Sequence, residues 1–139
     1  MTNIKIKLAA LWTARMLSGL QGDSTRLHNP VALKELVNGT SAVYVTDALL
    51  LIMSIIFAIP IFMIFLSLIL KDKANHLANR ITGLFFFVFD LIFLCLALFL
   101  WPFSAYETFW SIVYLVFTSL VVWNSWNWSK QEIESISSF

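Results

Sequence analysis

The chain has 139 residues, of which 60% are hydrophobic and 12% are charged, and its formal net charge is +1. Soluble domains carry about 25% charged residues, so this chain lacks the charge that a water-facing surface requires. Its mean hydropathy of +0.84 therefore indicates a membrane protein. The near balance of charge excludes a nucleic acid as partner, because no basic stripe is present to neutralise phosphates.

The length allows a single transmembrane domain over residues 1–139. Four spanning helices of about 20 residues each would use up the chain, which leaves no room for a separate catalytic domain. The only cysteine, Cys95, has no partner in the chain, so an intramolecular disulfide and a cysteine metal site are both excluded.

The first predicted span covers about residues 5–21. Lys5 and Lys7 precede an apolar stretch as in a signal peptide, but Arg15 interrupts that stretch, so we expect a retained helix. Small residues recur every four positions, at Ala10, Ala14, Ser18 and Gly22. Such a stripe allows close approach of another helix in lipid, which favours a spanning helix over one that lies in the interface.

A short amphipathic helix is predicted in the loop that follows. Asn29 is a typical N-cap, Pro30 suits the first helical position, and Gly39 follows the expected end. The apolar residues Leu33 and Leu36 give this helix one face for the membrane surface or the mouth of the bundle.

Three further spans are predicted at about residues 45–70, 81–101 and 105–128. Each has the length and apolar composition of a spanning helix. Lysine and arginine counts set the orientation, because cytoplasmic loops are enriched in both. With the N-terminus inside, six fall inside (Lys5, Lys7, Lys71, Lys73, Arg80, Lys130) and two outside (Arg26, Lys34). The expected location is a cytoplasmic (inner) membrane with both termini in the cytoplasm.

Several short strings, in this order, resemble a known family. They are "LWTARML", Gly22-Asp23, "NPVALKELVNG", "IPIFMIFLS", "ANHLAN" and "VVWNSWNW". Over roughly residues 8–128 the chain resembles a family of small prokaryotic four-helix membrane proteins catalogued as a domain of unknown function. The general layout is also similar to DoxX-like proteins. The resemblance implies a fold and a membrane location, and no reaction.

Two charges fall inside predicted spans. Asp90 lies nine residues beyond Ile81 and Arg15 ten residues beyond Lys5, so both lie about 14–15 Å deep. Each alone costs roughly 2.5–3.5 kcal/mol at a helix centre, so we expect them to offset each other. The pair is either a structural clamp or a proton or ligand site; a third alternative is that both face a water-filled cavity without touching.

Two other polar groups are candidates. Asp23, His28, Asp47 and Glu107 fall at the outer mouth, where carboxylates could hold a hard cation or could simply be helix-end charges. Asn75, Asn79 and Arg80 form an inner-loop group that could bind an anionic headgroup or cap a helix. No histidine and cysteine spacing indicates a metal site.

The sequence thus predicts an all-α integral membrane four-helix bundle with a short amphipathic helix in the outer loop. The leading hypothesis is a non-enzymatic binding or accessory protein whose interior receives an apolar or amphiphilic ligand, such as a quinone. A small redox or isomerase enzyme that uses Asp90 and Arg15 is the second, and an oligomeric transporter or channel subunit is the third. Partners are the lipid bilayer and a possible second copy of the chain; no cofactor is indicated.

Overall fold

A computed structural model describes residues 4–40, 45–99 and 104–137, with side chains up to Trp128. Within these ranges the chain is all-α, with five helices and no strand. The helices are α1 (Ile4–Leu27), α2 (Pro30–Val37), α3 (Asp47–Ile69), α4 (Asp72–Phe99) and α5 (Ala105–Ser137). The predicted all-α class is therefore confirmed.

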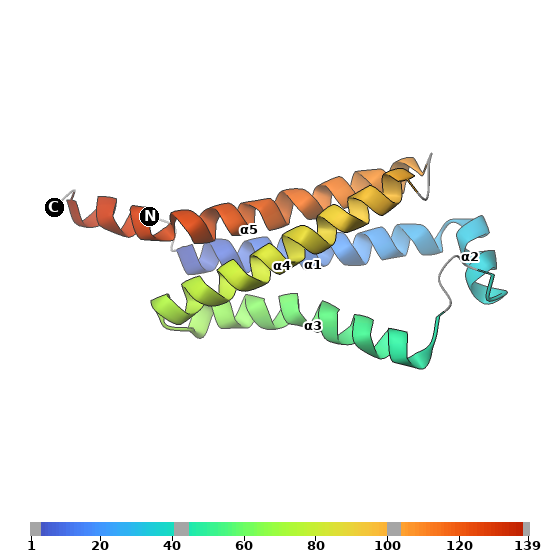
Figure 1. Cartoon of the computed structure of the whole chain (residues 1–139), viewed down its shortest axis with the longest axis horizontal. Helices are drawn as coiled ribbons and strands as arrows, with labels where there is room; N and C mark the ends of the chain where they lie inside the picture. The colour runs from blue at the N-terminus through green and yellow to red at the C-terminus, as the bar shows by residue number, and fades with distance from the viewer. Residues whose placement is uncertain (1–3, 41–44, 100–103, 138–139) are drawn as a thin grey trace.

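The four long helices run side by side, and α1 lies between α3 and α5 (Figure 1). The remaining large contact joins α4 to α5, whereas α3 and α4 share few contacts, among them the hydrogen bonds of Ser67 with Asn75 and Asn79. Toward its N-terminal end, beside α2, α3 diverges from the other long helices (Figure 1). The N-terminal helix is thus the central element of the packing.

Three of the described helices are long and apolar enough to cross a membrane, namely α3, α4 and the Ala105–Trp128 part of α5. The basic residues of α1 give it a lower hydropathy than these three. Most of the apolar surface of α3 is exposed in the isolated chain, including Leu51, Phe62 and Phe65. Exposed apolar side chains along the whole length of a helix are expected where lipid replaces water as the surrounding solvent.

The short helix α2 confirms the capping pattern. The Asn29 side chain accepts hydrogen bonds from the backbone N–H groups of Val31 and Ala32, and Pro30 is the first helical residue. Gly39 follows with a φ of 66°, a left-handed conformation that glycine adopts without strain. Every residue of α2 is at least partly exposed, so this helix contributes no buried side chain to the core.

The polar segment after α3 differs from the sequence prediction. It was expected to be a loop up to residue 80, but α4 begins at Asp72, so Asn75, Asn79 and Arg80 are helical. The reason is that the buried face of α4 extends through this segment, where polar side chains replace apolar ones. The predicted end of this span at Trp101 lies outside the described residues.

The buried face of α5 follows a regular spacing of four and three residues. Its members are Glu107, Ser111, Tyr114, Thr118, Val121, Ser125 and Trp128. Each serine or threonine donates a hydrogen bond to a carbonyl of its own helix, and the Thr118 hydroxyl also lies within hydrogen-bond reach of the Asp90 carboxylate on α4. Opposite them, a methyl group on Gly83 would lie 3.1 Å from Val121 Cγ1. Small side chains thus allow α4 and α5 to pack closely.

Candidate functional site

The centre of the molecule holds a buried ion pair between α1 and α4. Arg15 Nε donates a hydrogen bond to Asp90 Oδ2 at 3.0 Å, and Arg15 Nη2 donates to Asp90 Oδ1 at 2.5 Å. The two residues are 4% and 1% exposed, respectively. This parallel two-point geometry is the strongest arrangement that a guanidinium and a carboxylate can form.

Aromatic rings enclose this pair. The Arg15 guanidinium carbon lies 4.7 Å from the centroid of the Tyr114 ring and 5.8 Å from that of Phe86. Trp12 packs edge-on against Phe86, with ring centroids 5.8 Å apart. The remaining surface of the guanidinium therefore contacts ring faces rather than water, which adds cation–π attraction to the ion pair.

Tyr114 is held close to α1 by a glycine. A methyl group built on Gly22 would overlap the Tyr114 hydroxyl and lie 3.1 Å from the ring carbon Cζ. Gly22 is itself buried, so the tyrosine lies directly against the backbone of α1. Glycine is required here because of this close approach, which the small-residue stripe indicated only in general terms.

A hydrogen-bond network lies three to four turns away along α4, toward the start of that helix. Trp12 Nε1 donates to Asn79 Oδ1 at 2.7 Å, and Asn79 Nδ2 donates to Asn75 Oδ1 at 2.7 Å. Asn75 Nδ2 donates in turn to the Ser67 carbonyl at 2.6 Å, and the Ser67 hydroxyl donates to Asn79 Oδ1 at 3.3 Å. Since both asparagines are fully buried, they join α1, α3 and α4 and are not free to bind a headgroup in this structure.

The outer-mouth residues do not converge on one point. Glu107 binds Arg26 through two hydrogen bonds of 2.7 Å, an interaction that the sequence reasoning missed. Asp23, His28 and Asp47 are exposed, and the His28 ring bonds the Ser24 carbonyl of its own helix. Within the described ranges, no group of three or more His, Cys, Asp or Glu side chains could hold a metal ion.

Electrostatics at this mouth follow from the same contacts. Although Asp23 is exposed, neighbouring groups remove part of the hydration of its carboxylate, which raises its pKa above the ordinary value; Glu107 adds to the rise, while Arg26 opposes it. The hydrogen bonds that Arg26 donates to Glu107 raise the pKa of Arg26, which therefore stays charged.

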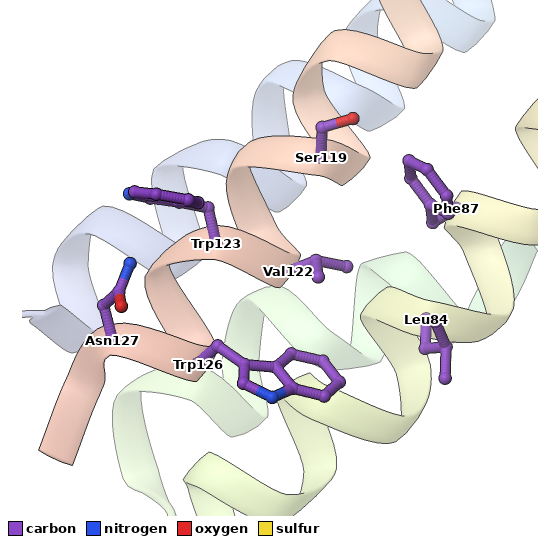
Figure 2. A pocket seen from close by; sticks show the side chains of 7 residues that line it. All are labelled: Leu84, Phe87, Ser119, Val122, Trp123, Trp126 and Asn127. Carbon is purple, nitrogen blue, oxygen red and sulfur yellow. The ribbon is translucent and has the colours of Figure 1, made fainter.

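Arg80 lies apart from both networks. Its Nη2 donates a long hydrogen bond of 3.4 Å to the Trp126 carbonyl, and its guanidinium carbon lies 5.0 Å from the centroid of a Trp126 ring. Trp126 lines a shallow groove between α4 and α5, which we call the α4/α5 groove (Figure 2). The groove residues are Leu84, Phe87, Ser119, Val122, Trp123, Trp126 and Asn127.

The central site has little capacity for acid–base chemistry on a substrate. The hydrogen bonds of the Asp90 carboxylate to Arg15 occupy both of its oxygens, and the surrounding rings leave the two residues almost without exposed surface. A general base must lie within hydrogen-bond reach of the proton that it removes. A substrate would have to displace Tyr114, Phe86 or Arg15 to come that close.

Comparison with known proteins gives a family. A model described as a family of unknown function, DUF6326, matches residues 2–135. The chain belongs to this family. No curated protein and no solved structure matches it. The predicted resemblance to a domain of unknown function is therefore confirmed, whereas no match supports the similarity to DoxX-like proteins.

Proposed function

We propose that this member of DUF6326 is an integral membrane protein in which α1, α3, α4 and α5 all cross the bilayer. At 1.5 Å per residue, the 24 residues of α1 reach about 36 Å, which exceeds a hydrocarbon core of ~30 Å. Because α1 lies between α3 and α5, it shares their depth if they span. The ion pair with Asp90 compensates the one charge in the middle of α1.

The proposed orientation puts both ends of the chain in the cytoplasm of a prokaryotic cell. Six lysines and arginines then lie on the inner side and two on the outer side, as the positive-inside rule favours. The turn between α3 and α4 is then cytoplasmic, and α2 lies on the outer surface.

The proposed role is that of a non-enzymatic accessory protein. The observation that carries it is the closed Arg15–Asp90 pair, in which Nε and Nη2 of the arginine donate to the two carboxylate oxygens and whose surroundings are filled by aromatic rings. This argues for a device that fixes α1 within the bundle rather than for an active site. Buried ionic groups that fix one arrangement of helices are a recognised use of such pairs.

The same packing argues against the transport alternative. On the buried face of α4, Phe86 lies between Asn79 and Asp90, and Trp12 covers it from α1. An apolar layer thus separates the inner hydrogen-bond network from the central ion pair. A continuous polar path through one copy of the chain would require these two rings to move.

Cysteine labelling in intact cells tests the proposed topology. In a Cys95→Ser background, single cysteines replace Lys7, Lys34 and Lys73, and a membrane-impermeant maleimide is added from outside. We expect labelling of the Lys34→Cys variant only, with the other two labelled after the membrane is permeabilised. Equal labelling of the Lys7→Cys and Lys34→Cys variants would show that α1 does not cross the membrane.

A further inference from the structure

Arg80 is distinguished from the other arginines by what it binds. Arg15 and Arg26 each hold a carboxylate through two hydrogen bonds. No carboxylate among the described side chains forms an ion pair with Arg80, and its Nε is buried without a hydrogen-bond partner. Arg80 as a whole is partly exposed, and its Nη2 makes only one long hydrogen bond, so the outer nitrogens of the guanidinium can contact an anion from outside the chain.

The position of Arg80 relates it to the α4/α5 groove. Arg80, Leu84 and Phe87 are spaced by four and three residues on α4, which puts them along one face of the helix. The guanidinium lies over Trp126, so the charge is at the end of the groove where α4 begins. Figure 2 shows Trp126 and Asn127 at this end and Ser119 and Phe87 at the other.

The groove itself is apolar. It extends along α5 from Ser119 to Trp126, a rise of about 10 Å. Apart from Ser119 and Asn127 its lining consists of aliphatic and aromatic side chains. The Ser119 hydroxyl donates to the Leu115 carbonyl of its own helix, so it adds little polarity to the far end. A charge at one end and an apolar channel beyond it match a molecule with an anionic head and a hydrocarbon tail.

We propose that the α4/α5 groove binds one anionic phospholipid of the cytoplasmic leaflet, with its phosphate on Arg80 and an acyl chain along Leu84, Val122 and Trp123. The inference rests on the proposed topology, which puts Arg80 near the cytoplasmic interface. Anionic lipids are enriched there, and basic pockets between spanning helices bind their headgroups. A guanidinium is well suited to phosphate because it donates two parallel hydrogen bonds, and Trp126 has the amphipathic ring typical of the interface.

Native mass spectrometry of the full chain in detergent tests this proposal. Dioleoyl phosphatidylglycerol and dioleoyl phosphatidylcholine are titrated separately, and bound lipids are counted. Both lipids carry a phosphate, but the choline group cancels its charge in phosphatidylcholine. We therefore expect one phosphatidylglycerol to bind about fivefold more tightly, the ratio for the attraction of about 1 kcal/mol between one basic residue and an anionic lipid. Arg80→Gln should abolish the preference. Lys73→Gln removes an equal charge from an exposed position near the same end of α4 and should retain it.

Two further experiments distinguish the contribution of the lipid headgroup from that of the acyl chain. Ser119→Phe places a ring at the far end of the groove and should weaken the binding of both lipids. Excess inorganic phosphate should not displace phosphatidylglycerol, because a free anion gains nothing from the groove. The proposal is overturned if Arg80→Gln keeps the preference, if Ser119→Phe binds as the wild type does, or if inorganic phosphate competes.

The outcome for this inference is separable from that for the topology. A wild-type protein with the expected cysteine labelling but equal affinity for the two lipids overturns the lipid site alone. A labelling pattern that contradicts the four spans overturns the proposed topology, whatever lipid is bound.

Discussion

Arg15 and Asp90 lie 75 positions apart in the chain and hold each other through two hydrogen bonds at the centre of the helix packing. Both side chains are almost fully buried, so each is the main compensation for the charge of the other. The relation connects α1, the most polar of the long helices, to α4, one of the most apolar. Its energetic consequences are open to direct measurement.

Breaking the pair at either end should be costly, and breaking it at both ends should cost little more. Arg15→Ala and Asp90→Ala each leave an uncompensated buried charge, for which we expect a loss of ~3–5 kcal/mol. In the double variant no charge remains, so its loss should be well below the sum of the two. Thermal unfolding in detergent, analysed as a double-mutant cycle, measures the coupling. Additive losses would contradict a structural pair.

The hydrogen-bond network that joins α1, α3 and α4 should depend for its stability on the side-chain amide of Asn79. Asn79→Ala removes the acceptor of the Trp12 indole N–H and a partner of Asn75, leaving buried polar groups without hydrogen bonds. We expect a loss of about 1–3 kcal/mol in the free energy of unfolding. Asn124→Ala is the matched control, because Asn124 bonds only the Leu120 carbonyl of its own helix. Equal effects of the two substitutions would contradict a network that joins helices.

The close approach of Tyr114 to Gly22 predicts that a substitution at one position compensates for the destabilising effect of a substitution at the other. Gly22→Ala places a methyl group where the tyrosine hydroxyl lies, and we expect a destabilisation of about 1–3 kcal/mol from overpacking. Adding Tyr114→Phe removes that hydroxyl and should restore part of the loss. Melting temperatures of the two single variants and the double variant check this. A double variant less stable than Gly22→Ala alone would mean that the hydroxyl does not cause the clash.

Asp23 predicts a specific pH dependence. Loss of hydration raises its pKa in the folded state, so the folded protein binds this proton more tightly than the unfolded chain does. The ionised carboxylate therefore costs stability above the raised pKa, and this cost disappears as the pH falls below the ordinary value. Asp23→Asn should raise the melting temperature near neutral pH and leave it unchanged in acid. A melting temperature lowered near neutral pH would contradict the sign.

Part of this structure could be predicted from residue patterns because local physics sets it. Asn29 and Pro30 specify the start of α2 through a capping geometry that needs only four neighbouring residues. The equal depths of Arg15 and Asp90 followed from helix rise alone, and the structure places the two side chains in contact.

The helical start of α4 has a signal in the sequence, namely the spacing of its buried residues. Asn75, Asn79, Gly83, Phe86 and Asp90 are spaced by four, four, three and four residues, which continues one buried helix face into the polar segment. The polarity of this segment favoured a loop, although the spacing of Asn75 and Asn79 already places the two residues on one helical face. The α4/α5 groove has no comparable signal in the residue spacing, because its shape depends on how the two helices cross.

The pairing of Arg26 with Glu107 could not be derived from sequence at all. The two residues lie 81 positions apart, at the ends of different helices, and their contact depends on the axial offset of α1 relative to α5. Depth arguments placed Glu107 at the correct level but grouped it with Asp23, His28 and Asp47 as carboxylates and a histidine at one mouth. Its actual partner is a cation, which leaves one acidic ligand fewer for a metal.

The distance along the chain between Arg15 and Asp90 also bears on how the protein is made. Ribosomes add about 5–20 residues per second, so the 75 positions between them correspond to roughly 4–15 s of synthesis. During that interval the arginine of the first helix has no counter-ion from its own chain. The final packing of α1 around Arg15 therefore requires a residue of α4, a helix that is made later.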